Sequence, residues 1–197
     1  MSSQDDADDF APNTTPGYKP TAAKSVDEYA KMDANDESLA RWKASLGITG
    51  EGGGDPTKRK VEVLTLELTS PSLPAGRTIS VDLNNPNQLA EMKDSPIQVK
   101  EGAEYSCHIK FKVNHSLVTG LRYIQVVKRG MVKVDKVDAM LGSYGYQADV
   151  RTASVVQDEF PSGMLARGTY NVKSRVTDID GEVWAEWEWL FKIGKEW

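Results

Sequence analysis

The sequence has one cysteine, Cys107, and two histidines, His108 and His115, in 197 residues. A single cysteine excludes an intrachain disulfide and is typical of reducing compartments. Cys107 and His108 are neighbours on a predicted strand, so their side chains point to opposite faces and do not readily form a thiolate–imidazole pair. The C-x-x-C, H-E-x-x-H, G-x-S-x-G and P-loop motifs are also missing. We therefore expect a protein that is not an enzyme and has no metal or cofactor.

Long apolar runs are absent as well. No stretch approaches the roughly 18 residues that a helix needs to span a bilayer. The N-terminal sequence MSSQDDADDF lacks the basic and apolar regions of a signal peptide. The formal net charge of −5 argues against binding to nucleic acid, whose phosphates require a basic face. These absences predict a cytosolic protein that binds no nucleic acid and does not insert into membranes itself.

The N-terminal segment is poor in aliphatic residues and rich in aspartate and proline. Residues 1 to about 24 bury too little apolar surface to offset their ordering entropy and are predicted to be disordered in isolation. A capping box opens a short predicted helix at about 25–33, and apolar residues at helical spacing predict a second at about 36–46. A glycine-rich hinge follows. Residues 1–59 are thus expected to form a flexible acidic arm whose two short helices need a surface to lie on.

From residue 60 onward the pattern changes to alternation with period two. Seven or more short strands, with no helical pattern between them, indicate an all-β, immunoglobulin-like antiparallel β-sandwich over residues 60–197. The Asn84-Asn85-Pro86 and Asp180-Gly181 segments are interpreted as turns, the latter as a tight hairpin. Large aromatic residues gather near the end, and they either fill a core or line a cavity between the sheets: Trp184, Trp187, Trp189, Phe191 and Trp197.

Several segments, in order and at matching spacing, resemble the Rho GDP-dissociation inhibitor family. The match runs from about residue 17 to the C-terminus, and eight short segments in order make coincidence improbable. They are Tyr18-Lys19-Pro20, Asp36-Glu37-Ser38-Leu39, Gly120-Leu-Arg-Tyr-Ile-Gln125, Lys133-Val-Asp-Lys136, Gly142-Ser-Tyr-Gly145, Gly163-Met-Leu-Ala-Arg-Gly168, Lys173-Ser-Arg175 and Trp187-Glu-Trp189.

The resemblance implies a specific set of partners. Proteins of this family bind prenylated small GTPases of the Rho and Rac types, preferentially with GDP bound, as 1:1 complexes of a monomer with its GTPase. The geranylgeranyl lipid lies between the two sheets, and the helical arm packs on the switch regions and restrains nucleotide release. The family also extracts its GTPases from membranes.

Carried over by position, the resemblance also implies the residues of two sites. The prenyl-binding residues are expected to be Leu66, Ile97, Tyr105, Leu117 and Trp189. The GTPase-binding residues are expected to be Tyr18, Asp36, Glu37, Ser38, Leu39, Trp42, Asp178 and Asp180.

Two departures from the family pattern bear on these expectations. The Ile97 position is often aromatic in animal relatives, which implies a pocket of different shape. The acidic run around Asp178 is broken by Ile179 and followed by Gly181, which alters the charge of this hairpin. The alternative is a general carrier of prenyl or acyl cargo without specificity for Rho proteins, and the acidic elbow at 36–39 argues against it.

Overall fold

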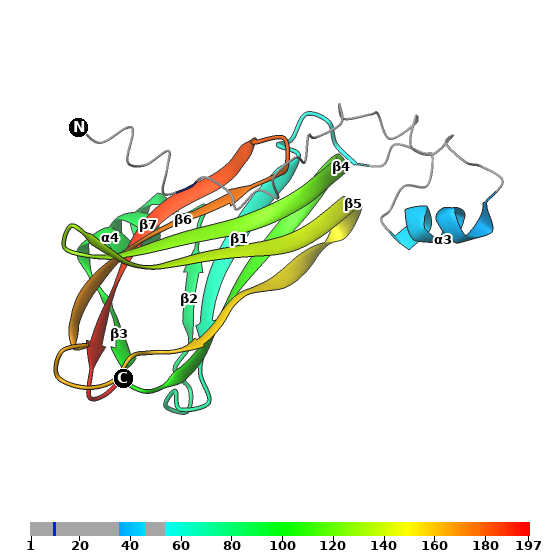
Figure 1. Ribbon diagram of the computed structural model, residues 1–197. Coiled ribbons are helices and arrows are strands. Elements are labelled where there is room, and N and C mark those ends of the chain that lie inside the picture. The colour runs from blue at the N-terminus through cyan, green and yellow to red at the C-terminus, as the bar shows by residue number, and fades with distance from the viewer. Residues whose placement is uncertain (1–9, 11–35, 46–53) are drawn as a thin grey trace.

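The structure, a computed structural model, describes residues 10, 36–45 and 54–197. They form a curled, mostly β structure with two short helices (Figure 1). This confirms the expectation of an immunoglobulin-like β-sandwich. Neither of the two described helices is long and apolar enough to cross a membrane.

Seven strands make one continuous sheet that curls over itself. Their order is β2-β1-β4-β6-β7-β3, and β5 pairs with β4 outside this path. The pairs are antiparallel except for β3 and β7, which run parallel with Ile97 opposite Phe191. The sequence analysis expected antiparallel strands only. The strands are β1 (Val61–Thr69), β2 (Ile79–Asp82), β3 (Ile97–Lys100), β4 (Glu104–Arg129), β5 (Val132–Glu159), β6 (Gly168–Thr177) and β7 (Val183–Gly194).

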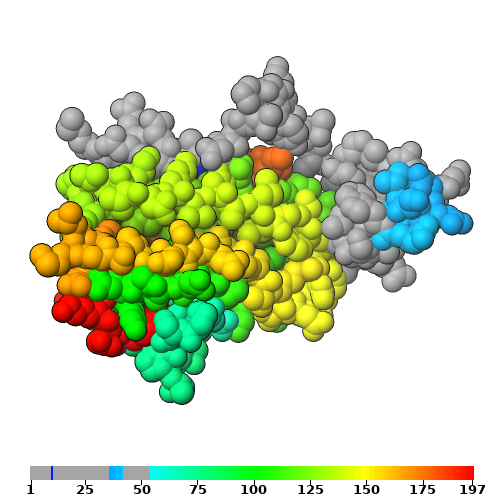
Figure 2. Space-filling view, turned by 60° about the horizontal axis from the view of Figure 1, so that its bottom comes forward, coloured from blue at the N-terminus to red at the C-terminus, as the bar shows by residue number. Residues whose placement is uncertain are grey.

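The two longest strands, β4 and β5, belong to both layers of the sandwich. Residues 104–113 of β4 pair with β1 and with residues 147–159 of β5, and together with β2 they form the first layer. Residues 117–129 of β4 pair with β6 and with residues 132–145 of β5, and together with β7 and β3 they form the second layer. Register shifts mark the crossing, where Ser116 has a positive φ of 61°. Figure 2 shows β5 crossing one face of the molecule, drawn from lime to yellow.

The space between the layers is filled by one apolar cluster. Alternation along each strand sends one set of side chains inward, as in β7, where residues 187, 189, 191 and 193 are buried and 186, 188 and 192 are exposed. Burying a large apolar side chain contributes about 1.5–3 kcal/mol, so this cluster dominates the stability of the sandwich. Its largest members include Phe111, Tyr123, Trp187, Trp189 and Phe191.

A helix that the sequence analysis missed, α4 (Pro86–Asp94), follows β2. The Asn84-Asn85-Pro86 segment was interpreted as a turn: a turn is present at 82–85, where the N–H of Asn85 donates to the carbonyl of Asp82 at 3.2 Å, but the helix that begins at Pro86 was not expected. Asn85 is the N-cap, and its side chain accepts from the backbone N–H groups of Asn87 and Gln88, while proline fits the first helical position because it lacks an N–H. Met92 is buried in the core, and α4 contacts both β2 and β7. The helix therefore covers the edge where the two layers part.

The described part of the arm contains α3 (Glu37–Ser45), within one residue of the helix predicted at 36–46. Its N-cap is Asp36, whose Oδ1 accepts from the N–H groups of Ser38 at 2.8 Å and Leu39 at 3.1 Å. The helix predicted at about 25–33 lies outside the described residues. The chain is attached to the sandwich from Gly54, because the N–H of Asp55 donates to the carbonyl of Asn114 at 3.0 Å.

Candidate functional site

The interior between the layers brings together four of the five residues expected to bind a prenyl group. Leu66 and Trp189 are buried in the core cluster, and Ile97 and Tyr105 are half-buried against it. Leu117 is half-buried near the crossing of β4 and is not among the residues that form or line this cluster. The sequence resemblance therefore located the apolar interior, with Leu117 as the exception.

Aromatic rings form a continuous path through this interior. Tyr105 stacks on Phe160 with ring centroids 3.9 Å apart, and Phe160 lies 5.6 Å from Phe191. Phe191 in turn stacks on Tyr170 at 5.0 Å and contacts Trp189 at 5.8 Å. Burial raises the pKa of the Tyr105 phenol well above its ordinary value, with nearby acidic groups acting in the same direction, so it is neutral at physiological pH. The rings are therefore uncharged, as a hydrocarbon site requires, and the Arg129 guanidinium lies 5.4 Å from the Tyr170 ring centroid.

A buried network of polar groups fixes the inner face of the second layer. The hydroxyl of Tyr123 donates to Oε1 of Gln125 at 2.6 Å and lies 2.9 Å from Oγ of Ser174. The indole N–H of Trp189 donates to the same Ser174 oxygen at 3.2 Å. All four side chains are buried. Because the network joins β4, β6 and β7, it sets the orientation of the Trp189 ring.

Two hollows adjoin α4 at the edge where the layers part. One, of about 560 Å³, is lined by Leu83, Leu89 and Trp187 together with Lys58 and Arg59 and neighbouring residues. The other, of about 460 Å³, has Ile79, Val81, Met92 and Ile97 in its wall. Both volumes lie within the range of small-molecule sites. Through Trp187, Met92 and Ile97, these hollows reach residues of the apolar interior or of its border.

Trp187 differs from the other tryptophans of β7 in its hydrogen bonding. Its indole N–H is buried and has no hydrogen-bond partner in the part of the chain that the structure describes. Trp184, by contrast, donates to Oδ2 of Asp178 at 3.0 Å, and Trp189 donates to Ser174. An unpartnered buried donor costs about 1–3 kcal/mol. The packing beside the α4 edge is therefore less favourable than that around Trp189.

The β6–β7 hairpin separates the two aspartates that were expected to face a GTPase. Five residues, 178–182, lie between the two strands. Within them the N–H of Gly181 donates to the carbonyl of Asp178 and the N–H of Asp178 donates to the carbonyl of Glu182, both at 3.2 Å, so the chain reverses in a tight turn at Asp180-Gly181, as predicted. Asp178 is buried, and its Oδ1 accepts from the N–H groups of Asp180 at 3.1 Å and Glu182 at 3.0 Å in addition to the bond from Trp184. Asp180 is exposed. Asp178 thus holds the hairpin together, and Asp180 is the carboxylate available to a partner.

The predicted arm residues lie in or beside α3 where they are described. Glu37 and Ser38 are exposed and Leu39 is half-buried. Asp36 acts as the N-cap, and Trp42 lies within α3, whereas Tyr18 lies outside the described residues.

Sequence reasoning missed two features of this region. Met92 and Leu89 of α4 belong to the apolar interior, and the Asn85–Pro86 pair was the signal that could have revealed their helix. Phe10 is buried against the outer side of the second layer, although its acidic surroundings predicted disorder. A single aromatic residue among acidic neighbours was the only indication in the sequence.

These features define a class of protein: an immunoglobulin-like β-sandwich with an aromatic interior and an N-terminal helix capped by Asp36. Residues 2–196 match the family described as RHO protein GDP dissociation inhibitor, and the chain belongs to this family. It is 39% identical to the Rho GDP-dissociation inhibitor of Schizosaccharomyces pombe, over 98% of this chain and 92% of that protein. It is 41% identical to Rho GDP-dissociation inhibitor 1 of Bos taurus, over 91% of this chain and 86% of that protein. The Saccharomyces cerevisiae Rho GDP-dissociation inhibitor is 39% identical, over 91% of each chain.

Proposed function

We propose that this protein binds Rho-family small GTPases that carry a geranylgeranyl group, preferentially with GDP bound, and draws them from membranes as 1:1 complexes in the cytosol. In this proposal residues 60–197 hold the lipid and residues 1–59 act as a regulatory arm. Family membership supports the partner class. The observation that carries the lipid site is the uncharged aromatic interior, which approaches solvent at the hollows beside α4.

The lipid alone does not account for extraction. A geranylgeranyl chain has about 20 carbons, and burial contributes about 0.8 kcal/mol per CH₂-sized unit, so transfer from water gains more than roughly 10 kcal/mol. The bilayer offers a similar gain, and exchange from membrane to protein is nearly neutral. A second contact with the folded GTPase must supply the difference, and joining two sites in one chain strengthens both through effective concentration.

The arm is the natural second contact. Glu37 and Ser38 of α3 are exposed, and the Asp36 cap holds the start of the helix. A helix placed across the switch regions favours the GDP-bound state only to the extent that it binds that state more tightly. Restraint of nucleotide release therefore requires the arm, whereas the sandwich alone suffices to hold lipid.

A vesicle-release experiment tests the lipid site. Ile97 is half-buried in the wall of the 460 Å³ hollow, whereas Gln147 is exposed on β5 and does not line it. Ile97→Glu is expected to raise the protein concentration needed to release a geranylgeranylated, GDP-bound Rho protein from vesicles by at least about tenfold, because an acid replaces apolar contact. Gln147→Glu adds the same charge outside this hollow and serves as the control. Equal release by the two variants contradicts the proposed site.

Measurements of peptide binding and of GDP release separate this function from that of a general prenyl or acyl carrier. Such a carrier would bind a bare farnesylated peptide tightly and would be indifferent to removal of residues 1–59. We expect the truncated chain to bind lipid-modified peptide but to lose most of its effect on GDP release. Unchanged inhibition of GDP release by the truncated chain would favour the general carrier.

A further inference from the structure

The outer face of the second layer is apolar at its centre, which is unusual for a side of a sheet turned away from the core. Along β4, Tyr123 and Val127 belong to the core between the layers. Alternation therefore directs Ile124 and Val126 to the opposite face. These two side chains are nonetheless buried, with 0% and 2% of their surface exposed. Something must cover them on that side.

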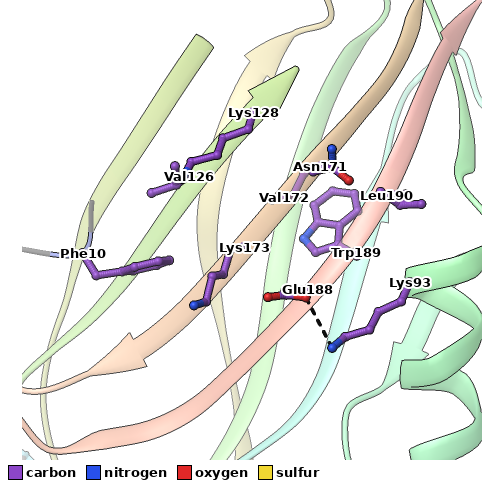
Figure 3. Close-up of a pocket in the computed structure, with 10 residues that line it drawn as sticks. All are labelled: Phe10, Lys93, Val126, Lys128, Asn171, Val172, Lys173, Glu188, Trp189 and Leu190. Atoms are coloured by element: carbon purple, nitrogen blue, oxygen red, sulfur yellow. Dashed lines mark ion pairs between the residues drawn. The ribbon is translucent and has the colours of Figure 1, made fainter. Parts of the chain in front are cut away.

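The described residue that covers them is Phe10. Phe10 is 4% exposed and forms a separate apolar cluster with Ile124 and Val126. Phe10 and Val126 are drawn in Figure 3. The guanidinium carbon of Arg175 lies 4.2 Å from the ring centroid, and Nζ of Lys173 lies 5.4 Å from it. Both distances are within the range of cation–π attraction. Phe10 thus packs on an apolar surface bordered by two cations of β6. Both cations also form ion pairs with Glu186 of β7, at 3.2 Å for Lys173 and 2.6 Å for Arg175, so the border is basic by one net charge.

The surface under Phe10 continues into a groove that crosses β6 and β7. A hollow of about 300 Å³ runs from Phe10 past Lys128 and Leu190 to the ion pair between Lys93 of α4 and Glu188, whose charged atoms are 3.3 Å apart (Figure 3). Lysines therefore stand at both ends of a partly apolar groove. In the sequence, Phe10 directly follows the acidic run Asp5-Asp6-Ala7-Asp8-Asp9. An aromatic residue next to carboxylates matches an apolar floor edged by cations in both shape and charge.

We propose that the outer face of the second layer is a docking site for the chain's own N-terminal segment, with Phe10 as the anchor and the preceding aspartates facing the basic border. The chain is then attached to the sandwich at two points, Phe10 and Gly54. In the sequence, these two points lie on either side of α3. This inference does not depend on lipid binding.

Methyl NMR of the full chain tests directly whether Phe10 packs on Ile124 and Val126. An aromatic ring over Ile124 and Val126 shifts their methyl resonances, and Phe10→Ala is expected to remove those shifts while leaving the methyls of Val172, inside the core, unchanged. Because Phe10 lies outside the sandwich core, this variant keeps its fold, and the Val172 signals verify that. Unchanged Ile124 and Val126 resonances in Phe10→Ala would overturn the proposal.

A peptide added to the Phe10→Ala chain tests what the site recognises. The peptide QDDADDFAPNTT, residues 4–15, should restore the shifted Ile124 and Val126 resonances, and the same peptide with alanine in place of phenylalanine should not. Its affinity should fall severalfold when salt is raised from about 0.05 M to 0.5 M, because the border contacts are ionic. No restoration at millimolar peptide, or shifts in the unmodified chain that depend on protein concentration and so report a second copy, would refute docking in cis.

A charge variant isolates the contribution of the cations. Arg175→Met keeps an unbranched side chain but removes the charge nearest the ring. In the Phe10→Ala background it should lower the affinity for the wild-type peptide at least threefold. Lys192→Met removes an exposed cation from the neighbouring strand β7 and is the matched control. Equal affinity in the two charge variants would contradict the role assigned to Arg175.

Discussion

Replacing Ser174 by alanine probes the polar network that fixes the interior of the second layer. The Ser174 hydroxyl is fully buried and accepts from the indole N–H of Trp189 at 3.2 Å. Without it, the Tyr123 hydroxyl keeps its bond to Gln125, at 2.6 Å, but the Trp189 N–H is left without an acceptor. Leaving one buried donor unsatisfied costs about 1–3 kcal/mol. For a chain of this size, each kcal/mol lowers Tm by roughly 2–4 °C.

Urea unfolding followed by tryptophan fluorescence measures this loss. Ser174→Ala should lower the free energy of unfolding by about 1–3 kcal/mol with an unchanged denaturant slope. Ser80→Ala removes an exposed hydroxyl from β2 and should stay within about 0.5 kcal/mol of the parent. Trp189→Phe removes the donor of the same hydrogen bond. The loss of unfolding free energy in the double variant should therefore be smaller than the sum of the losses in the two single variants. A Ser174→Ala loss below about 0.5 kcal/mol refutes the reasoning.

Three further predictions concern the carboxylates. Asp36→Ala should lower α3 stability by about 1 kcal/mol and weaken GTPase affinity, and Asp36→Asn should restore both if the cap rather than the charge matters, as measured by titration with labelled GTPase. Asp178→Ala should lower Tm by several degrees because it strands the Trp184 donor, whereas Asp180→Ala should leave Tm unchanged and affect GTPase binding alone. The hydrogen bond from the Arg167 side chain lowers the pKa of Glu101 below its ordinary 4.5. The protection of the 163–167 loop against hydrogen exchange is therefore complete above about pH 4.5 and lost as pH falls through the folded-state pKa, and Glu101→Gln should abolish this acid dependence.

The strands were predictable because each buries one face. In β1 and β7 the alternation of apolar and polar residues is nearly unbroken; it predicts strands at 61–69 and 186–193, and the observed strands cover 61–69 and 183–194. The pattern fails at residues 114–116, where β4 crosses between layers. A local change of backbone direction interrupts alternation, so the sequence predicts two strands, at 105–113 and 122–127, where the structure has one. The parallel pairing of β3 with β7 depends on long-range packing that no local pattern encodes.

Helix α4 escaped prediction for a different reason. It has nine residues, and its start, two asparagines and a proline, is equally typical of a turn. What makes it a helix is the burial of Met92 at the edge of the sandwich, together with capping by Asn85. Both depend on tertiary contacts or on geometry that composition leaves open.

For the expected site residues, burial was predicted best where the side chain is apolar. Leu66 and Trp189 lie in the interior because their strands alternate and that face is buried. The role of Asp178 could not be predicted in the same way, because a carboxylate near a turn is usually solvated. The indole N–H of Trp184 and two backbone N–H groups come back to it only when the β6–β7 hairpin forms. Hydrogen-bond partners of this kind follow from the loop geometry.

The proposed function requires an interior that is stable without lipid and yet admits one, and the placement of its polar groups makes these two demands compatible. The network of Tyr123, Gln125, Ser174 and Trp189 lies entirely within the second layer, on β4, β6 and β7. The residues that the first layer contributes to the core, such as Leu66, are apolar. Parting the layers at the α4 edge therefore exchanges apolar contacts with protein for apolar contacts with hydrocarbon, while the buried hydrogen bonds stay intact. If the network instead bridged the layers, each bond broken on opening would oppose lipid uptake by about 1–3 kcal/mol.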